Sequence, residues 1–306
     1  MSGIDLNLEI SPMSKFNNSR FLVVGTARDV ANTLISEINC LYNSLINSRK
    51  LTFFIVESDS RDNTVRLLDE LATQLPDFNY VSLGNLSNHV PSRIERLSIA
   101  RNTYLNYVKQ NVASFDYVIV ADLDGINFLL TEEKIVSCFK YSGWGCCTAN
   151  QVGPYYDVFA LRADSWCETD CWSSARKLAS SGMNPLKAWR ISIRDKQIRI
   201  PQSRDWISVN SAFGGLAIYD IQAFIVGAYS TNSDNETGIC EHVAFNLDLK
   251  KAGWKIFINP ALTNFDFNSH NDFDKLTRKL KFAFKFLYSY FFPQKFISHM
   301  MPELKL

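Results

Sequence analysis

Two carboxylates one residue apart, Asp122 and Asp124, are the most informative residues for chemistry in this chain. They follow the mostly apolar run 116–121, whose β-branched residues predict a buried strand. Ligands of open α/β sheets bind at the carboxyl ends of strands, and hard divalent cations share carboxylate ligands with substrate phosphates. The pattern therefore predicts a site for Mn²⁺ or Mg²⁺ and a diphosphate. A solvated acidic pair in a loop is the alternative.

Two earlier loops also follow expected strands. Thr26, Ala27 and Arg28 come after the first strand, where backbone amides and the Arg28 guanidinium could hold a nucleotide. Glu57 and Asp59 come after the second strand, where carboxylates could accept hydrogen bonds from a base or from ribose hydroxyls. The alternatives are an ordinary β–α turn with a surface arginine and, for the second loop, helix capping.

Three arginines lie just before the strand that leads into Asp122 and Asp124, which we call the Asp-x-Asp motif. Arg93, Arg96 and Arg101 belong to one segment with helical periodicity, in which Arg93 and Arg96 are one turn apart. The planar guanidinium fork suits diphosphate recognition, so Arg93 and Arg101 are candidates for donor binding. A solvated basic helix face is the alternative.

A predicted helix that begins with Glu241 and His242 supplies a further group of reactive residues. An acid is favourable in the first helical turn and would be placed there to act as a catalytic carboxylate. His242 could bind a metal or orient an acceptor, and His270, in the polar loop 266–271, could complete the metal shell. The alternatives are an acid that only complements the helix dipole and a partly buried structural histidine.

Alternating strands and helices must position these residues. A first set of strands is expected at 21–24, 51–56, 80–83 and 116–121. Because helices separate them, this βαβαβαβ order predicts a mostly parallel sheet with right-handed crossovers. A second set of strands is expected at 144–149, 157–162, 212–219 and 254–258. A helix at 241–251 should end at Gly253, and the polar segment 165–205 is interpreted as an insertion over the active cleft.

Composition narrows the class of protein. The chain has 306 residues, of which 46% are hydrophobic and 21% charged, as in a globular protein that buries a sizeable core. A net charge of +1 gives no overall signature of nucleic-acid binding. Seven cysteines without a Cys-x-x-Cys pair suit reduced thiols in the cytoplasm. The polar N-terminus is not typical of a signal peptide, and no apolar run approaches the ~18 residues of a membrane-spanning helix.

The last segment, 271–306, has a different character. Its lysines and arginines follow one helical face, and its leucines and phenylalanines crowd the other. A basic, aromatic amphipathic helix of this kind could bind an anionic membrane surface, which would place the protein at the inner face of the cell membrane. The alternative is a terminal helix that packs on the domain with its basic face in water.

Together these motifs resemble the GT-A nucleotide-sugar glycosyltransferases. The resemblance rests on Glu-Ser-Asp-Ser-Arg-Asp-Asn-Thr at 57–64, on the Asp-x-Asp motif, and on the acid-opened helix. The stretch 241–260 resembles family-two transferases, although Glu241-His242 replaces their acidic pair. A more specific similarity, to the fungal capsule-associated α-1,3-mannosyltransferase family, rests on the segments 93–102, 155–162 and 240–242.

The resemblance implies an α/β, Rossmann-like fold with a mixed, mostly parallel sheet flanked by helices. The expected domain spans 21–270, with a donor half at 21–130 and an acceptor half at 131–270, after an N-terminal extension at 1–20. The implied reaction moves a hexose, with mannose favoured, from a GDP- or UDP-linked donor to a glycan or lipid-linked glycan in surface polysaccharide synthesis.

The resemblance also implies residue roles. Asp124 would hold the metal with Asp122, which could instead meet the donor ribose or sugar beside Leu123. Glu241 would be the acceptor's general base in an inverting reaction, and a retaining route stays open. The candidates for acceptor binding are Tyr155, Tyr156 and Asp157. Two other functions remain as alternatives: a sugar-nucleotide nucleotidyltransferase and a non-catalytic carbohydrate-binding protein on the same fold.

Overall fold

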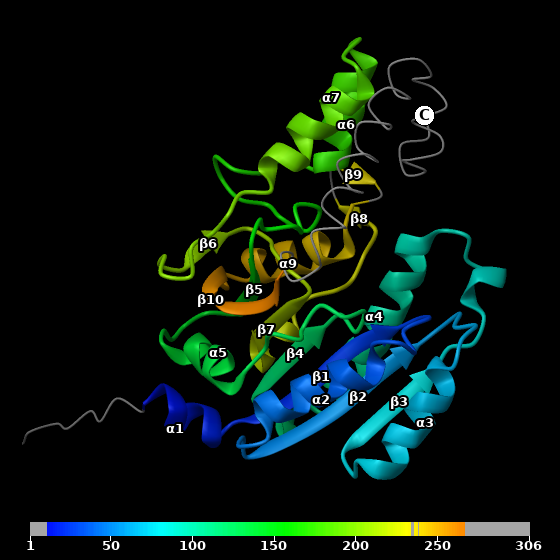
Figure 1. The fold of residues 1–306 in the computed structure, drawn as a ribbon, viewed down its shortest axis with the longest axis vertical. Coiled ribbons are helices and arrows are strands. Elements are labelled where there is room, and N and C mark those ends of the chain that lie inside the picture. Colours follow the sequence, from blue (N-terminus) through cyan, green and yellow to red (C-terminus); the bar gives the residue numbers. More distant parts are fainter. Residues whose placement is uncertain (1–10, 234–235, 238, 267–306) are drawn as a thin grey trace, which may run out of the picture.

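Eight strands form the central sheet, and helices pack on both of its faces (Figure 1). The computed structural model describes residues 11–233, 236–237 and 239–266. The sheet strands are β1 (Arg20–Ala27), β2 (Lys50–Glu57), β3 (Phe78–Ser82), β4 (Tyr117–Ala121), β5 (Cys146–Val152), β6 (Ile207–Val209), β7 (Leu216–Asp220) and β10 (Ile256–Asp266). A separate antiparallel pair is formed by β8 (Asn232–Ser233) and β9 (Glu236–Thr237).

The helices connect these strands. They are α1 (Pro12–Asn17), α2 (Leu34–Leu45), α3 (Thr64–Gln74), α4 (Arg93–Gln110), α5 (Glu132–Val136), α6 (Cys171–Ser180), α7 (Pro185–Ser192), α8 (Ile221–Phe224) and α9 (Glu241–Lys251). Single-turn 3₁₀ helices lie at Leu86–Asn88, Val112–Ser114, Ser137–Phe139 and Arg194–Lys196.

The sheet order is β3-β2-β1-β4-β7-β5-β10-β6. β1 pairs in parallel with β2 and β4, as do β2 with β3 and β5 with β10. β7 is antiparallel to β4 and β5, and β6 is antiparallel to β10. The predicted mixed, mostly parallel sheet is confirmed. Because β1 and β4 are neighbours, the loop after Ala27 and the Asp-x-Asp motif leave the sheet side by side.

Alternating side chains of the inner strands divide the core into two layers. Leu22 of β1 belongs to the layer that includes Tyr104 of α4 and Phe245 of α9. The next residue, Val23, belongs to the opposite layer with Ile38 of α2. All five side chains are fully buried, which explains why the first strands are continuous apolar runs instead of alternating patterns.

The predicted strand at 157–162 is wrong, because these residues form a loop. The Asp157 carboxylate accepts hydrogen bonds from the N–H groups of Ala160, at 3.2 Å, and Gly214, at 2.9 Å. These bonds turn the chain instead of extending it. Val158 and Leu161 are nevertheless buried in the core, so the loop carries the apolar pattern that is typical of a strand.

α9 ends as the sequence predicts. Gly253 has φ +88°, its N–H donates to the Lys250 carbonyl, and the Trp254 N–H donates to the Leu249 carbonyl. This is a Schellman motif, in which the left-handed residue is favoured to be glycine. The motif returns the chain to the sheet as β10.

The C-terminal predictions fall outside the described residues. They concern His270 as a metal ligand and the amphipathic tail at 271–306. Within the part of the chain that the structure describes, no helix has the length and apolar character needed to cross a membrane.

Phe16 docks α1 on the sheet, within the segment that the sequence assigns to an extension. Its side chain is fully buried, and its ring centroid lies 5.6 Å from that of Phe21. We expect Phe16→Ala to lower the free energy of unfolding by about 3–5 kcal/mol, because it deletes a buried ring and leaves a cavity. Met13→Ala, on the same helix at a residue that is 41% exposed, should change it by less than about 0.5 kcal/mol. Urea denaturation followed by circular dichroism compares the two, and equal effects would contradict the docking of α1.

Candidate active site

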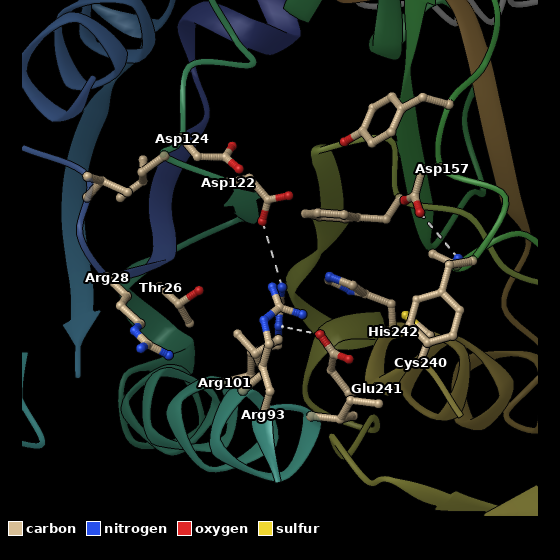
Figure 2. A pocket seen from close by; sticks show the side chains of 18 residues that line it. Thr26, Arg28, Arg93, Arg101, Asp122, Asp124, Asp157, Cys240, Glu241 and His242 are labelled. Atoms are coloured by element: carbon tan, nitrogen blue, oxygen red, sulfur yellow. Dashed lines mark hydrogen bonds and ion pairs between the residues drawn. The ribbon is translucent and has the colours of Figure 1, made fainter. Parts of the chain in front are cut away.

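A cavity of about 320 Å³ lies where the carboxyl ends of β1 and β4 face the amino ends of α4 and α9 (Figure 2). Its walls come from segments that are far apart in the sequence. The lining residues are Thr26, Arg28, Val30, Arg93, Ile94, Leu97, Arg101, Asp122, Leu123, Asp124, Tyr156, Asp157, Phe159, Ala160, Phe213, Cys240, Glu241 and His242.

The backbone after β4 holds Asp122 and Asp124 at this cavity. The Asp122 N–H donates to the Gly215 carbonyl at 2.9 Å. The backbone hydrogen bonding between β4 and the chain at β7 therefore continues one residue beyond β4. The Leu123 carbonyl then accepts from the Thr33 hydroxyl at 2.8 Å. Both carboxylates therefore stand on backbone that is fixed by hydrogen bonds rather than on a free loop.

Buried polar side chains support the same loop from below. The Asn127 amide donates to the Asp122 carbonyl at 2.7 Å and to Glu37 Oε2 at 2.7 Å, and the Asn127 N–H donates to Glu37 Oε1 at 3.1 Å. Asn264 of β10 donates to Asn127 Oδ1 at 3.2 Å and to the Gly214 carbonyl at 2.8 Å. Burial raises the pKa of Glu37 despite the hydrogen bonds that it accepts. The network thus links α2, the Asp-x-Asp loop, β10 and the segment before β7.

Arg101 is the central charge of the cavity. Its buried side chain places Nε 3.0 Å from Glu241 Oε1 and Nη2 3.7 Å from Asp122 Oδ1 (Figure 2). The guanidinium carbon also lies 5.6 Å and 5.8 Å from the ring centroids of Phe213 and Tyr229, within the range of cation–π attraction. Burial alone would lower the pKa of Arg101, but the surrounding acidic groups hold it well above the ordinary value.

The carboxyl group of Asp122 is strongly perturbed. Burial raises its pKa to about 7, and the charges of Asp124, Asp157 and Glu241 act in the same direction while Arg101 opposes them. Its side chain is still 32% exposed, so it remains open to a ligand in the cavity. An additional cation beside Asp122 would favour the ionised form, because an opposite charge lowers the pKa of a carboxyl group.

His242 follows Glu241 in the first turn of α9 and is buried. Its ring stacks on Phe213, with centroids 3.8 Å apart and planes inclined by 20°. Neither ring nitrogen has a hydrogen-bond partner among the described residues. Burial, together with the charge of Arg101, lowers the pKa of His242 well below its usual range. The imidazole is therefore neutral at physiological pH.

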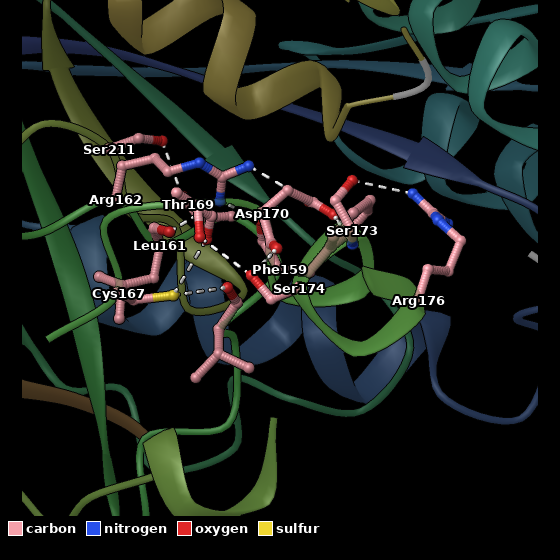
Figure 3. Close-up of polar contacts among 12 residues, drawn as sticks. Phe159, Leu161, Arg162, Cys167, Thr169, Asp170, Ser173, Ser174, Arg176 and Ser211 are labelled. Carbon is pink, nitrogen blue, oxygen red and sulfur yellow. Dashed lines mark hydrogen bonds and ion pairs between the residues drawn. The ribbon is translucent and has the colours of Figure 1, made fainter. Parts of the chain in front are cut away.

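A buried ion pair fixes the loop that carries Asp157 (Figure 3). Arg162 Nη2 lies 3.2 Å from Asp170 Oδ2, and Arg162 Nη1 donates to the carbonyls of Phe159 and Leu161. Asp170 is also the N-cap of α6, where its Oδ1 accepts from the Ser173 N–H at 2.7 Å. The cavity loop and α6 are therefore held by one carboxylate, although no residue of 165–205 lines the cavity itself.

Glycine permits close approach at two points of the site. A Cβ atom on Gly25 would lie 2.6 Å from the Ala121 carbonyl oxygen, and one on Gly215 would lie 2.9 Å from the Tyr156 hydroxyl. Gly215 also has φ +81°, which other residues rarely adopt. The absence of these side chains lets the ends of β1 and β4 meet and lets Tyr156 lie over the start of β7.

Most candidates from the sequence converge on this cavity. Those that line it are Thr26, Arg28, Arg93, Arg101, Asp122, Leu123, Asp124, Tyr156, Asp157, Glu241 and His242. Ala27 and Tyr155 do not line it, because both side chains are buried in the hydrophobic core. His270 lies outside the described residues.

Glu57 and Asp59 also lie away from the cavity lining, and their hydrogen bonds shape the second loop. The Ser60 N–H donates to Glu57 Oε1 at 2.9 Å. Asp59 accepts from the Ser87 N–H at 2.7 Å and pairs with Arg96 at 3.3 Å. Burial would raise the pKa of Asp59, but these partners lower it below the ordinary value. Arg96 therefore pairs with Asp59 and does not line the cavity.

Some residues of the site carry no chemical signal in the sequence. Phe213 lies in an apolar run that predicts a strand, yet it forms the surface on which His242 stacks. Glu37 and Asn127 are 90 positions apart and meet only in the folded chain. The one available clue is that Glu37 interrupts the apolar face of its helix, next to the buried Ile38.

No family model and no curated protein sequence matches this chain, but solved structures that resemble it include a mannosyltransferase and a glucosyl-3-phosphoglycerate synthase. A mannosyltransferase, PcManGT from Pyrobaculum calidifontis in complex with GDP-Man and Mn²⁺, has TM-score 0.49 and 14% identity. S. aureus TarS 1-349 has TM-score 0.44 and 12% identity. Glucosyl-3-phosphoglycerate synthase from Mycobacterium tuberculosis, in complex with UDP, has TM-score 0.38 and 12% identity.

The matches differ in extent. The match to PcManGT covers 88% of this chain and 62% of the PcManGT chain, and the match to TarS covers 85% and 64%. The match to glucosyl-3-phosphoglycerate synthase covers 94% of this chain and 85% of that chain. The chain thus spans less than two thirds of the first two proteins. The function proposed below therefore rests on the residues of the site.

The Arg101–Glu241 pair allows a test of the buried charges. We expect Arg101→Met to lower the free energy of unfolding by about 3–5 kcal/mol, because it leaves a buried carboxylate uncompensated. Arg101→Met combined with Glu241→Gln should recover most of this loss. As a control, the double variant Arg190→Met with Asp195→Asn removes an exposed pair and should cost less than about 1 kcal/mol. Urea unfolding measures all variants, and strictly additive effects of the Arg101 and Glu241 substitutions would contradict the coupling.

Proposed function

We propose that the chain is a metal-dependent glycosyltransferase of the GT-A type that uses a nucleoside-diphosphate sugar. The observation that carries the proposal is the convergence of Asp122, Asp124, Arg101 and Glu241 on one cavity. Two acids after a central strand suit a cation with a diphosphate, and arginines suit phosphate charge. A buried carboxylate at the start of a helix, in the same cavity, suits a general base.

The donor set at Asp122 and Asp124 fits Mn²⁺ or Mg²⁺, which take carboxylate oxygens and share other positions with substrate phosphates. Burial beside other acids raises the pKa of Asp122 to about 7, so this end of the cavity favours an added positive charge. The described residues contain no group of three His, Cys, Asp or Glu side chains that could hold a metal. The diphosphate, and His270 as the sequence proposes, would supply further ligands. When bound, the ion neutralises the charge that develops on the departing diphosphate.

Two arginines complete the proposed donor side. Arg28 comes from the loop after β1 and Arg93 from the first turn of α4, and both line the cavity with Asp122 (Figure 2). Their guanidinium groups bind phosphate oxygens, and Thr26 and Leu123 contact the nucleoside or the sugar between them.

Glu241 provides the proposed base. Its contact with Arg101 at 3.0 Å fixes the orientation of the carboxylate in the cavity. In an inverting reaction Glu241 takes the proton of an acceptor hydroxyl as that oxygen attacks the anomeric carbon and the bond to the diphosphate breaks. His242, Tyr156 and Asp157 lie on the same side and contact the acceptor.

The finer assignment follows the resemblance of the sequence. The segments 93–102, 155–162 and 240–242 support a mannose-type hexose, from a GDP- or UDP-linked donor, as the transferred sugar. The proposed acceptor is a glycan or a lipid-linked glycan in surface polysaccharide synthesis. The basic tail at 271–306 would hold the enzyme at an anionic membrane surface.

Asp124 provides the test of the metal. We expect Asp124→Asn to reduce transfer by about 100-fold or more, because the charge on the leaving diphosphate loses its stabilisation. The melting temperature should change little, since Asp124 is exposed on a loop. Asp77→Asn, at an exposed loop carboxylate outside the cavity lining, is the control. Sugar transfer from a panel of nucleotide-sugars should vanish in EDTA and return with Mn²⁺, and full turnover in EDTA would refute the metal role.

Glu241→Gln removes the basic carboxylate of Glu241 and keeps the size and shape of the side chain. We expect kcat to fall by ~10²–10⁴-fold because the amide cannot take the acceptor proton, while the Kd of the donor stays within a few-fold of wild type. Asp248→Asn, at a half-exposed carboxylate on the same helix, should leave both constants unchanged. Steady-state kinetics and donor titration measure the two effects. A Glu241→Gln enzyme within a few-fold of wild type would assign Glu241 to helix capping.

A further inference from the structure

The cavity has two chemically different halves. Of its 18 lining residues, the ten that precede residue 125 include three arginines and two aspartates. The eight that follow residue 155 include the carboxylates Asp157 and Glu241 and no lysine or arginine. We call these eight residues the imidazole half, after His242. The two groups of residues therefore differ in the charged side chains that they contribute, and Arg101 of the first group contacts Glu241 of the second.

His242 has unused hydrogen-bonding capacity in the imidazole half. Its side chain is more than nine-tenths buried, and neither ring nitrogen is paired within the described chain. A buried polar group without a partner is costly, so such groups are usually satisfied in the state that functions. Because the ring stacks on Phe213 at 3.8 Å, it cannot turn freely to find another partner. Since His242 also lines the cavity, its unpaired nitrogens leave hydrogen-bonding capacity that a ligand there could use.

The protonation state of His242 defines that ligand. A neutral imidazole offers one N–H donor and one acceptor nitrogen, and a hydroxyl group likewise donates and accepts. The half-buried rings of Tyr156 and Phe159 line the same half and provide apolar surface beside these polar atoms. Carboxylates accept hydrogen bonds from hydroxyls, and Asp157 and Glu241 lie in this half. The combination is complementary to an uncharged, hydroxyl-rich ring.

An anionic group would be disfavoured in the same place. It would lie beside the carboxylates of Asp157 and Glu241, in an environment where burial already raises the pKa of Asp157. The nearest cation, Arg101, already contacts two acids, Glu241 and Asp122. Like charges in a poorly solvated site repel strongly, and among the described lining residues the imidazole half itself contributes no lysine or arginine to offset that repulsion.

We propose that the imidazole half binds a neutral sugar unit of the acceptor and rejects sugar acids, and that His242 determines this specificity by hydrogen bonding to a hydroxyl. The inference rests on the proposed glycosyltransferase function and deepens it by naming the acceptor class. Asp157 and Glu241 supply the repulsion, and His242 supplies the attraction that an uncharged hydroxyl can use.

Matched sugars test the charge preference directly. Methyl glucoside and methyl glucuronoside differ only at C6, and the mannose and galactose pairs offer the same comparison. Their Kd values for the full-length protein are measured by saturation-transfer NMR with diamagnetic Mg²⁺ and either GDP or UDP present. At least one neutral glycoside should bind about 10-fold or more tightly than its acid. Equal or tighter binding of the acids, or no binding of any neutral glycoside, would overturn the proposal.

Two substitutions test the role of His242. His242→Phe retains a ring that can stack on Phe213 but removes both nitrogens, so the Kd of the preferred glycoside should rise about 10-fold. His242→Gln restores a donor and an acceptor and should bring the Kd back to within about 3-fold of wild type. Melting curves confirm that both variants fold. Wild-type affinity in His242→Phe would overturn the proposal, as would equal losses in the two variants.

A separate measurement distinguishes this inference from the proposed function. Thermal shift with Mn²⁺ and GDP or UDP reports on the donor half without any acceptor. If a nucleotide stabilises the protein but no neutral glycoside binds more tightly than its acid, only the acceptor assignment is refuted. No stabilisation by either nucleotide, with selective and His242-dependent binding of a neutral glycoside, would refute the transferase and leave a neutral-sugar site.

Discussion

The buried charge of Arg101 is the constraint on which the site depends. Arg101 is only 5% exposed, and its guanidinium group must have acidic partners because a lone charge in the protein interior is strongly destabilising. Its partners come from two other elements, Asp122 from the end of β4 and Glu241 from the start of α9. One guanidinium group therefore links α4 to the end of β4 and to the start of α9. The same guanidinium group contacts both of these cavity carboxylates.

A second layer of polar contacts makes this arrangement rigid. Glu37 and Asn127 hold the backbone at Asp122, and Asn264 extends the network to Gly214. Every one of these side chains is buried, so an alternative loop conformation would leave unpaired polar groups in the core. The network also reaches the imidazole half of the cavity, since the Gly214 N–H donates to Asp157. The two halves of the site are thus supported by one continuous set of hydrogen bonds.

Burial shifts the pKa values of two ionisable groups of the cavity in opposite directions. Burial raises the pKa of Asp122 to about 7 and lowers the pKa of His242, because the charged form is disfavoured in both cases. At Asp122 the shift favours the protonated carboxyl group. At His242 it preserves a neutral donor and acceptor. One physical cause, burial, therefore shifts the pKa values of an acid and a base in the same cavity in opposite directions.

The sequence alone identified most strands of the sheet and most of the predicted site residues that line the cavity. Apolar runs buried on both faces, such as the one around Val23, identify strands whatever their neighbours are, and Gly253 marks the end of α9 through a local backbone requirement. The Asp-x-Asp motif and the acid-opened helix were recognisable because each is a short contiguous pattern at the end of an element.

Tertiary structure decided which of these residues meet. Asp59 and Arg96 both belong to plausible donor-binding motifs, yet they pair with each other outside the cavity lining. The segment 157–162 has the apolar pattern of a strand, but hydrogen bonds from two backbone N–H groups to Asp157 bend it into a loop. These outcomes depend on partners far away in the chain, such as Gly214, and on competition among polar groups for burial. Local sequence does not encode that competition, because polar groups lose water and find distant partners only when the helices and strands pack together.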